Sequence, residues 1–171
     1  MCIRDSAQPA DAPTRGELLA KFAPAAEVYG VLAGLESWKI HRKWAEKNRA
    51  RYGPLVQDRL DRARGISQAQ VAAVQPSHEA ILLAWRSFFL AHDFLIIPAT
   101  PFPALAKADC IPANRLRMLG LTTPASLGGL PVLTIPVPLP SGMSTGLQVI
   151  VNHPQSPAIP WVLARCRQSS A

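Results

Sequence analysis

The sequence holds little cysteine, and its three cysteines are Cys2, Cys110 and Cys166. Their number is odd, and no two of them stand in a C-x-x-C spacing, so the pattern disfavours a disulfide framework and a structural zinc site. Reduced thiols instead favour a cytoplasmic protein. We expect neither a metal ion nor a cofactor.

Long apolar runs and self-sufficient catalytic motifs are also missing. No uninterrupted apolar run approaches the ~18 residues of a transmembrane helix, so no membrane partner is expected. The sequence contains no H-E-x-x-H, no P-loop and no G-x-G-x-x-G. Its four histidines, His41, His78, His92 and His153, are scattered along the chain. No residue of this chain is therefore assigned a catalytic role.

Proline, in contrast, is abundant, with 17 residues in a chain of 171. Twelve of them lie between Pro98 and Pro160. Proline removes a backbone donor and fixes φ, which makes it a poor residue for helix interiors and central strands. The C-terminal half is therefore predicted to consist of turns and short strands, after a helical N-terminal half.

Apolar spacings of three and four predict the helices, and glycine and proline mark their ends. Ser67 is a candidate N-cap, Gly65 a stop, and Pro76 a kink or restart. The expected helices span residues 24–50, 54–64 and 67–91. The residues expected to face inward on the second and third helices are Leu55, Val56, Leu60, Ile81, Leu82, Trp85, Phe88 and Phe89.

Short apolar runs predict three strands of one sheet, at residues 94–98, 132–137 and 146–151. The last two should pair antiparallel, because only about eight residues join them. The first should join the same sheet through an irregular connection, and the helix ending at residue 91 should pack on the sheet. Residues 7–16 are small and polar and suggest a linker.

The net charge of +7 is concentrated in one segment. Residues 36–64 hold nine Lys and Arg against four Asp and Glu, a net charge of +5. Interleaved with Trp38, Trp44 and Tyr52, these cations could bind RNA by phosphate contacts and stacking. The same aromatic residues suit helix packing, so RNA binding is kept as an alternative and nucleic acid is not the expected partner.

Three motifs in order resemble the C-terminal part of the amidase signature family. They are PATPFPA at 98–104, TTPASLGGLPVLTIPV at 122–137 and GLQVIV at 146–151. The resemblance covers roughly residues 25–165. It implies an α/β fold, the C-terminal part of the amidase signature fold, with helices followed by strands of a mixed sheet. Residues 1–23 would be a linker or a non-native segment, and 24–171 the C-terminal portion of an amidase domain.

The resemblance also implies an activity, hydrolysis of a carbon–nitrogen amide bond by a Ser–cis-Ser–Lys triad held in a Gly/Ser-rich loop. Family members carry that triad in their N-terminal half. None of the five lysines here has the required context, and the one Ser-Ser pair is Ser169-Ser170. We therefore expect this chain alone to be inactive and its partner to be the N-terminal half of the same enzyme.

The resemblance places the stretch from residue 122 to 131 in a loop between strands, where sheet-based sites are built. Gly128 and Gly129 would let backbone approach a neighbouring element or the substrate. The residues predicted to lie nearest the substrate pocket are Thr122, Ser126, Leu127 and Gly128. The alternative is that this loop only packs the sheet. Residues 118–121 carry no acid, which disfavours glutamine and favours a small amide with an apolar part.

Overall fold

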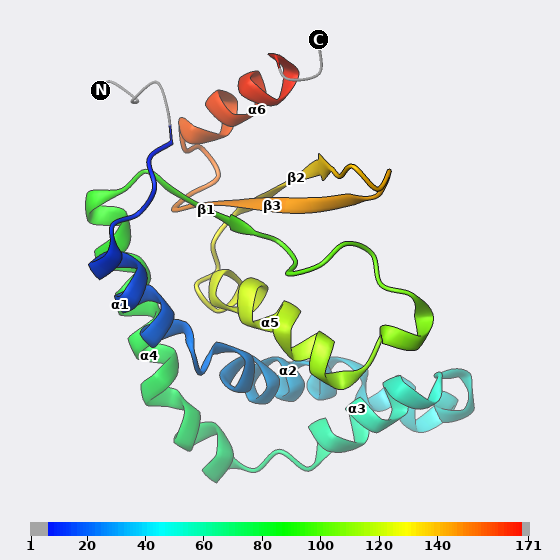
Figure 1. Cartoon of the computed structure of the whole chain (residues 1–171). Coiled ribbons are helices and arrows are strands. Elements are labelled where there is room, and N and C mark those ends of the chain that lie inside the picture. Colours follow the sequence, from blue (N-terminus) through cyan, green and yellow to red (C-terminus); the bar gives the residue numbers. More distant parts are fainter. Residues whose placement is uncertain (1–6, 169–171) are drawn as a thin grey trace.

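The computed structural model describes residues 7–168 and places an antiparallel sheet between helices (Figure 1). Its helices are α1 (Ala12–Phe22), α2 (Ala25–Asn48), α3 (Pro54–Arg64), α4 (Gln68–Ala91), α5 (Pro112–Leu127) and α6 (Ala158–Gln168). Its strands are β1 (Phe94–Pro98), β2 (Val132–Pro138) and β3 (Ser144–Val151). Short 3-10 turns, η1 (Arg49–Arg51) and η2 (Lys107–Asp109), complete the described elements.

The sheet has the order β1-β3-β2, with β3 paired antiparallel to both neighbours. In the register, Val149 of β3 stands opposite Ile96 on one side and Leu133 on the other. The α/β class, the pairing of the last two strands and the entry of β1 into the same sheet are confirmed. The expected mixed sheet is not found among the described residues, where every strand pair is antiparallel.

The two faces of β3 serve two apolar clusters, because successive side chains of a strand point to opposite faces. Ile150 joins the larger cluster, in which Ile81, Trp85 and Phe88 of α4 pack with residues of α2. Val149 and Val151 join the second cluster, which includes residues of α6. Figure 1 shows α6 on one side of the sheet and α5 on the other. The predicted packing of α4 on the sheet is thereby confirmed.

The helices predicted for the N-terminal half are confirmed nearly to the residue. Ser67 caps α4 in a capping box, in which Gln70 N donates to Ser67 Oγ at 3.2 Å and Ser67 N donates to Gln70 Oε1 at 2.9 Å. The helix does not restart at Pro76. On α3, Leu60 is buried, whereas Leu55 and Val56 are exposed, so two of its three expected inward residues are wrong.

Helix α1 corrects the prediction of a linker, which extended to residue 23. Asp11 caps this helix by accepting a hydrogen bond from Thr14 N at 2.8 Å. Phe22 packs against the larger cluster, with its ring centroid 4.6 Å from that of Trp85. The helix has no buried residue of its own and its stabilising contact is tertiary, which is why the sequence pattern did not reveal it.

Helix α5 corrects the prediction of an irregular connection followed by a loop. The helix contains Pro124 and ends in a Schellman motif, in which Leu130 N donates to Ala125 O and Gly129 N donates to Ser126 O. Gly129 has φ +62°, the left-handed conformation that this motif requires. Because α5 lies between β1 and β2, and α6 follows β3, the order is not helices first and strands second.

A stretch within Ala12–Arg51 is long and apolar enough for a membrane span, by length and composition only. The sequence prediction did not anticipate this, since charged residues interrupt the stretch. It is divided between α1 and α2, which are separated at Ala23 and Pro24, and Phe22 and Val28 from the two helices join the core. Its contacts with the core account for its apolar residues without a membrane.

The glycines after α5 should be irreplaceable for different reasons. A Cβ on Gly128 would lie 2.9 Å from Trp85 Cδ1, so Gly128→Ala should cost about 1–3 kcal/mol through overpacking. A Cβ on Gly129 would meet nothing within 4 Å, and Gly129→Ala should instead cost about 1–2 kcal/mol through its positive φ. Urea unfolding measures both.

The matched control is Gly30→Ala, at an exposed helical position where a Cβ also meets nothing within 4 Å. It should be neutral or stabilising by up to about 1 kcal/mol. Equal stability of Gly129→Ala and this control would contradict the assigned backbone role.

Candidate functional site

Two of the four predicted pocket residues, Thr122 and Ser126, lie on the last two turns of α5 rather than in a loop. Ser126 is exposed and Thr122 is half-buried. Thr122 Oγ1 donates to Met118 O at 3.3 Å, and Ser126 Oγ donates to Thr122 O at 3.2 Å. Both hydroxyls thus bond to carbonyls of their own helix, four residues back, and their oxygens remain able to accept a hydrogen bond.

The other two predicted residues face the core. Leu127 packs against the larger cluster, and its carbonyl lies 3.3 Å from His78 Nε2. Gly128 lies against the Trp85 ring, whose Nε1 donates to Pro124 O at 2.8 Å. Packing therefore accounts for this pair. Within residues 7–168, none of the four predicted residues lines the hollow between α2 and α3 or the hollow between the sheet and α6.

A residue that the sequence reasoning missed, Gln148, connects the three motif segments. Its side chain is 2% exposed, and Nε2 donates to Pro98 O at 3.0 Å and to Leu121 O at 2.9 Å. One amide of β3 thus holds the end of β1 and the start of the TTP segment in α5. A polar residue inside the apolar run GLQVIV was the available signal, because a buried amide needs partners.

The stretch GMSTG at 142–146 matches the G-x-S-x-G pattern of serine hydrolases. In that motif the serine stands on a sharp turn between a strand and a helix. Here Ser144 begins β3 after the turn of a β2–β3 hairpin, in which Gly142 has φ +77°. The surroundings therefore do not make Ser144 a nucleophile, and Gly142 is explained by its turn.

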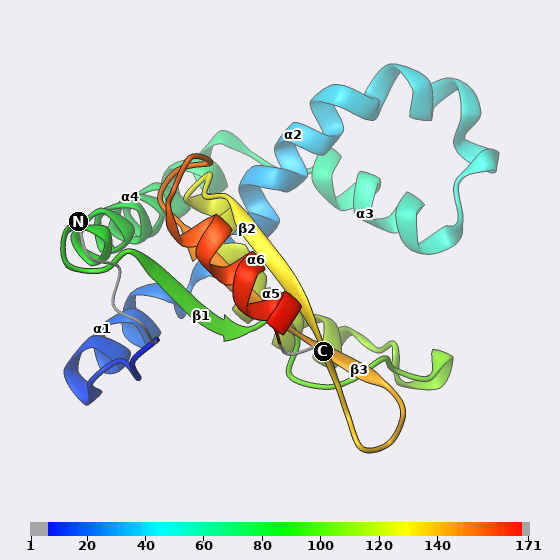
Figure 2. The same ribbon diagram turned by 90° about the horizontal axis from the view of Figure 1, so that it is seen from above.

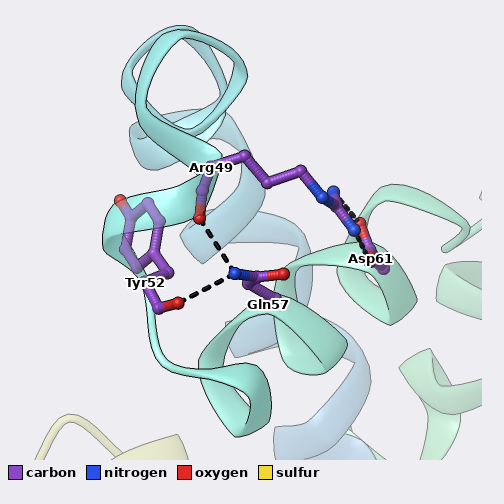
Figure 3. Close-up of polar contacts among 4 residues, drawn as sticks. All are labelled: Arg49, Tyr52, Gln57 and Asp61. Atoms are coloured by element: carbon purple, nitrogen blue, oxygen red, sulfur yellow. Dashed lines mark hydrogen bonds and ion pairs between the residues drawn. The ribbon is translucent and has the colours of Figure 1, made fainter.

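A hollow of about 200 Å³ lies between α2, η1 and α3. Beside it, Arg49 and Asp61 form a two-point ion pair, with nitrogen–oxygen distances of 2.8 and 2.5 Å (Figure 3). Gln57 Nε2 donates to Arg49 O at 2.9 Å and to Tyr52 O at 2.8 Å. The hydrogen bond from Arg49 lowers the pKa of the Asp61 carboxyl. These contacts fasten the two helices together.

A second hollow, of about 310 Å³, lies between the sheet and α6. Its lining is almost wholly apolar and includes Ile96, Ile135, Leu147, Val149, Trp161 and Val162. Such a lining offers packing but no acid, base or nucleophile. Among residues 7–168, no three His, Cys, Asp or Glu side chains gather as a metal site would require.

Comparison with known proteins gives one curated relative of clear similarity. A glutamyl-tRNA(Gln) amidotransferase subunit from Archaeoglobus fulgidus is 31% identical over 135 residues, which are 73% of this chain and 28% of that protein. A solved amidase matches with a TM-score of 0.72 and 25% identity, over 84% of this chain and 36% of the other. The chain belongs to the amidase signature family.

A bacterial aryl acylamidase of the amidase signature family has the same fold, with a TM-score of 0.58 and 16% identity. It is matched over 77% of this chain and 30% of its own. No family model matches the chain. The chain spans less than a third of the curated relative's length, so only part of an amidase signature enzyme is represented.

Removal of the Gln148 amide should destabilise the fold. Gln148→Leu keeps the volume but leaves Pro98 O and Leu121 O without their shared donor, which should cost about 1–3 kcal/mol. Gln75→Leu is the control, because Gln75 is exposed on α4 and bonds only Glu79 in the same helix. Urea unfolding should show at most about 0.5 kcal/mol for the control. Equal losses would contradict the bridging role.

The Arg49–Asp61 pair should make a small contribution to stability that acid removes. Because the pKa of Asp61 is lowered in the folded chain, its charged form stabilises the fold at neutral pH, and the effect is lost progressively below about pH 5. The Tm of Asp61→Asn should lie below that of the parent at pH 7 and converge with it in acid. Asp58→Asn, also exposed on α3, should show less pH dependence of its difference.

Proposed function

We propose that this chain is the C-terminal portion of an amidase that hydrolyses a carbon–nitrogen amide bond. Its role is scaffold and one wall of the substrate pocket. The supporting observation is the 31% identity to the archaeal amidotransferase, together with the junction at Gln148, where all three family motifs meet. A junction of segments far apart in sequence is what a scaffold needs to hold a pocket wall in place.

The chemistry would come from the N-terminal half of the same enzyme. A lysine would accept the proton of the nucleophilic serine through a bridging serine, and backbone donors would stabilise the oxyanion. Among residues 7–168 no hydrogen bond joins a lysine to a serine. Ser169-Ser170 lies outside the described residues. The active arrangement therefore requires the missing half.

The proposed pocket wall is the outer side of α5 near Thr122 and Ser126. Both hydroxyls can accept a hydrogen bond from an amide N–H, while Leu127 and Gly128 hold this end of the helix against α4. Residues 118–121 read MLGL and supply no acid for an ammonium group. The substrate class that this wall favours is a small amide with an apolar part.

The alternative is a non-catalytic module that binds RNA through residues 36–64. All nine Lys and Arg of this segment are exposed, which favours phosphate contacts. The aromatic residues are less suited, because Trp44 is packed edge to face with Tyr52 and Trp38 lines the hollow beneath Arg64. A steep loss of RNA affinity with salt would favour this alternative.

The purified chain alone should hydrolyse no simple amide, since loss of a nucleophile and base acting as a unit lowers rates by about 10⁶. The test pairs it with the N-terminal half of an amidase signature enzyme expressed as a separate chain. Amide hydrolysis should appear only in the mixture and be blocked by a serine-directed reagent. Robust turnover by the chain alone, blocked by the same reagent, would contradict the proposal.

A further inference from the structure

Residues 36–64, here called the arm, project from the rest of the molecule. Figure 2 shows the C-terminal half of α2 running outward and α3 returning from its tip. The arm holds nine Lys and Arg against four Asp and Glu. Its outer surface is therefore accessible and strongly positive in the described chain.

One side of α2 within the arm combines apolar and cationic side chains. Ile40 is 76% exposed and Trp44 is 48% exposed, and the two stand one helical turn apart. Lys43 and Lys47 each stand three residues beyond one of them, on the same side. We call these four residues the Ile40–Trp44 stripe. The opposite side of the helix is used internally, because Ala45 there is buried.

The arm is held in one shape by polar contacts of its own. Arg49 and Asp61 join η1 to α3, and Gln57 bonds two carbonyls of the tip. Trp44 is packed against Tyr52 with ring centroids 5.2 Å apart, and Arg51 lies 6.0 Å from the Trp44 centroid. A stripe fixed in this way loses little conformational entropy on binding a partner.

We propose that the Ile40–Trp44 stripe is a docking surface for an acidic amphipathic helix of a partner protein. Leucine-type side chains of that helix would pack on Ile40 and Trp44, and its carboxylates would pair with Lys43 and Lys47. Helix-to-helix docking by apolar anchors one turn apart is an established mode of recognition. This inference goes beyond the proposed function and does not rest on it.

Charge and side-chain chemistry separate this partner from the other occupants. A second copy would bring another arm of net charge +5 against the first, and like charges oppose such contact. Nucleic acid offers nothing to the aliphatic Ile40, and the Trp44 ring already packs with Tyr52 and lies near Arg51. An acidic helix satisfies both the apolar and the cationic members of the stripe.

The test measures fluorescence anisotropy of a labelled synthetic peptide, helical over about four turns, with Leu at positions i and i+4 and Glu on either side. A peptide of the same composition, scrambled to lose its apolar face, is the matched probe. The full chain should bind the first peptide at least about tenfold more tightly than the second, a difference of about 1.4 kcal/mol. Ile40→Ser and the double variant Lys43→Glu, Lys47→Glu should each lose about tenfold.

Arg86→Glu, an exposed charge reversal on α4, should leave the affinity unchanged, and circular dichroism should show equal helicity for all variants. Equal binding of the two peptides, or an equal loss with Arg86→Glu, would overturn the proposal. Tighter binding of a single-stranded RNA homopolymer, of anionic phosphatidylserine vesicles or of a second copy of the chain would overturn it as well. Amidase complementation is not used in this test, so the two proposals fail separately.

Discussion

The structure depends on the hydrogen bonds that the buried Gln148 amide makes across the fold. Its nitrogen donates to a carbonyl at the end of β1 and to a carbonyl in α5, so one side chain joins segments 27 and 50 residues away. A buried amide is costly unless its partners are present. The alignment of β1, β3 and α5 therefore has to be correct for the core to form.

The central strand carries the rest of the packing. Ile150 serves the cluster of α4 and α2, and its neighbours Val149 and Val151 serve the cluster of α6. Gly146 belongs to the same arrangement, because a Cβ there would lie 3.2 Å from Ala99 Cβ and 3.3 Å from Thr134 Cγ2. The GLQVIV motif is thus a structural element that brings the other two motifs together.

Scaffold and surface are divided between different parts of the chain. The half with the sheet and α5 carries the family motifs, and the proposed pocket wall stands on its outer side. The arm has a small polar core of its own around Gln57 and exposes most of its charge. An enzyme can hold a catalytic framework rigid in one part and present a partner surface in another, because rigid elements keep the two apart.

The sequence by itself determined the local features. Ser67, Gly65 and the apolar spacing defined α2, α3 and α4, since caps and helical periodicity act over a few residues. The three motifs identified the family and the strands. The short hairpin between β2 and β3 required their antiparallel pairing.

Only the tertiary structure decided the features that depend on distant partners. Pro124 suggested a loop, yet its carbonyl accepts a hydrogen bond from Trp85 within a helix that packs on α4. Helix α1 has few apolar residues and forms where Phe22 meets Trp85. Leu127 and Gly128, predicted for a pocket, face the core for the same reason. Local pattern cannot report such contacts, because the stabilising atoms lie tens of residues away.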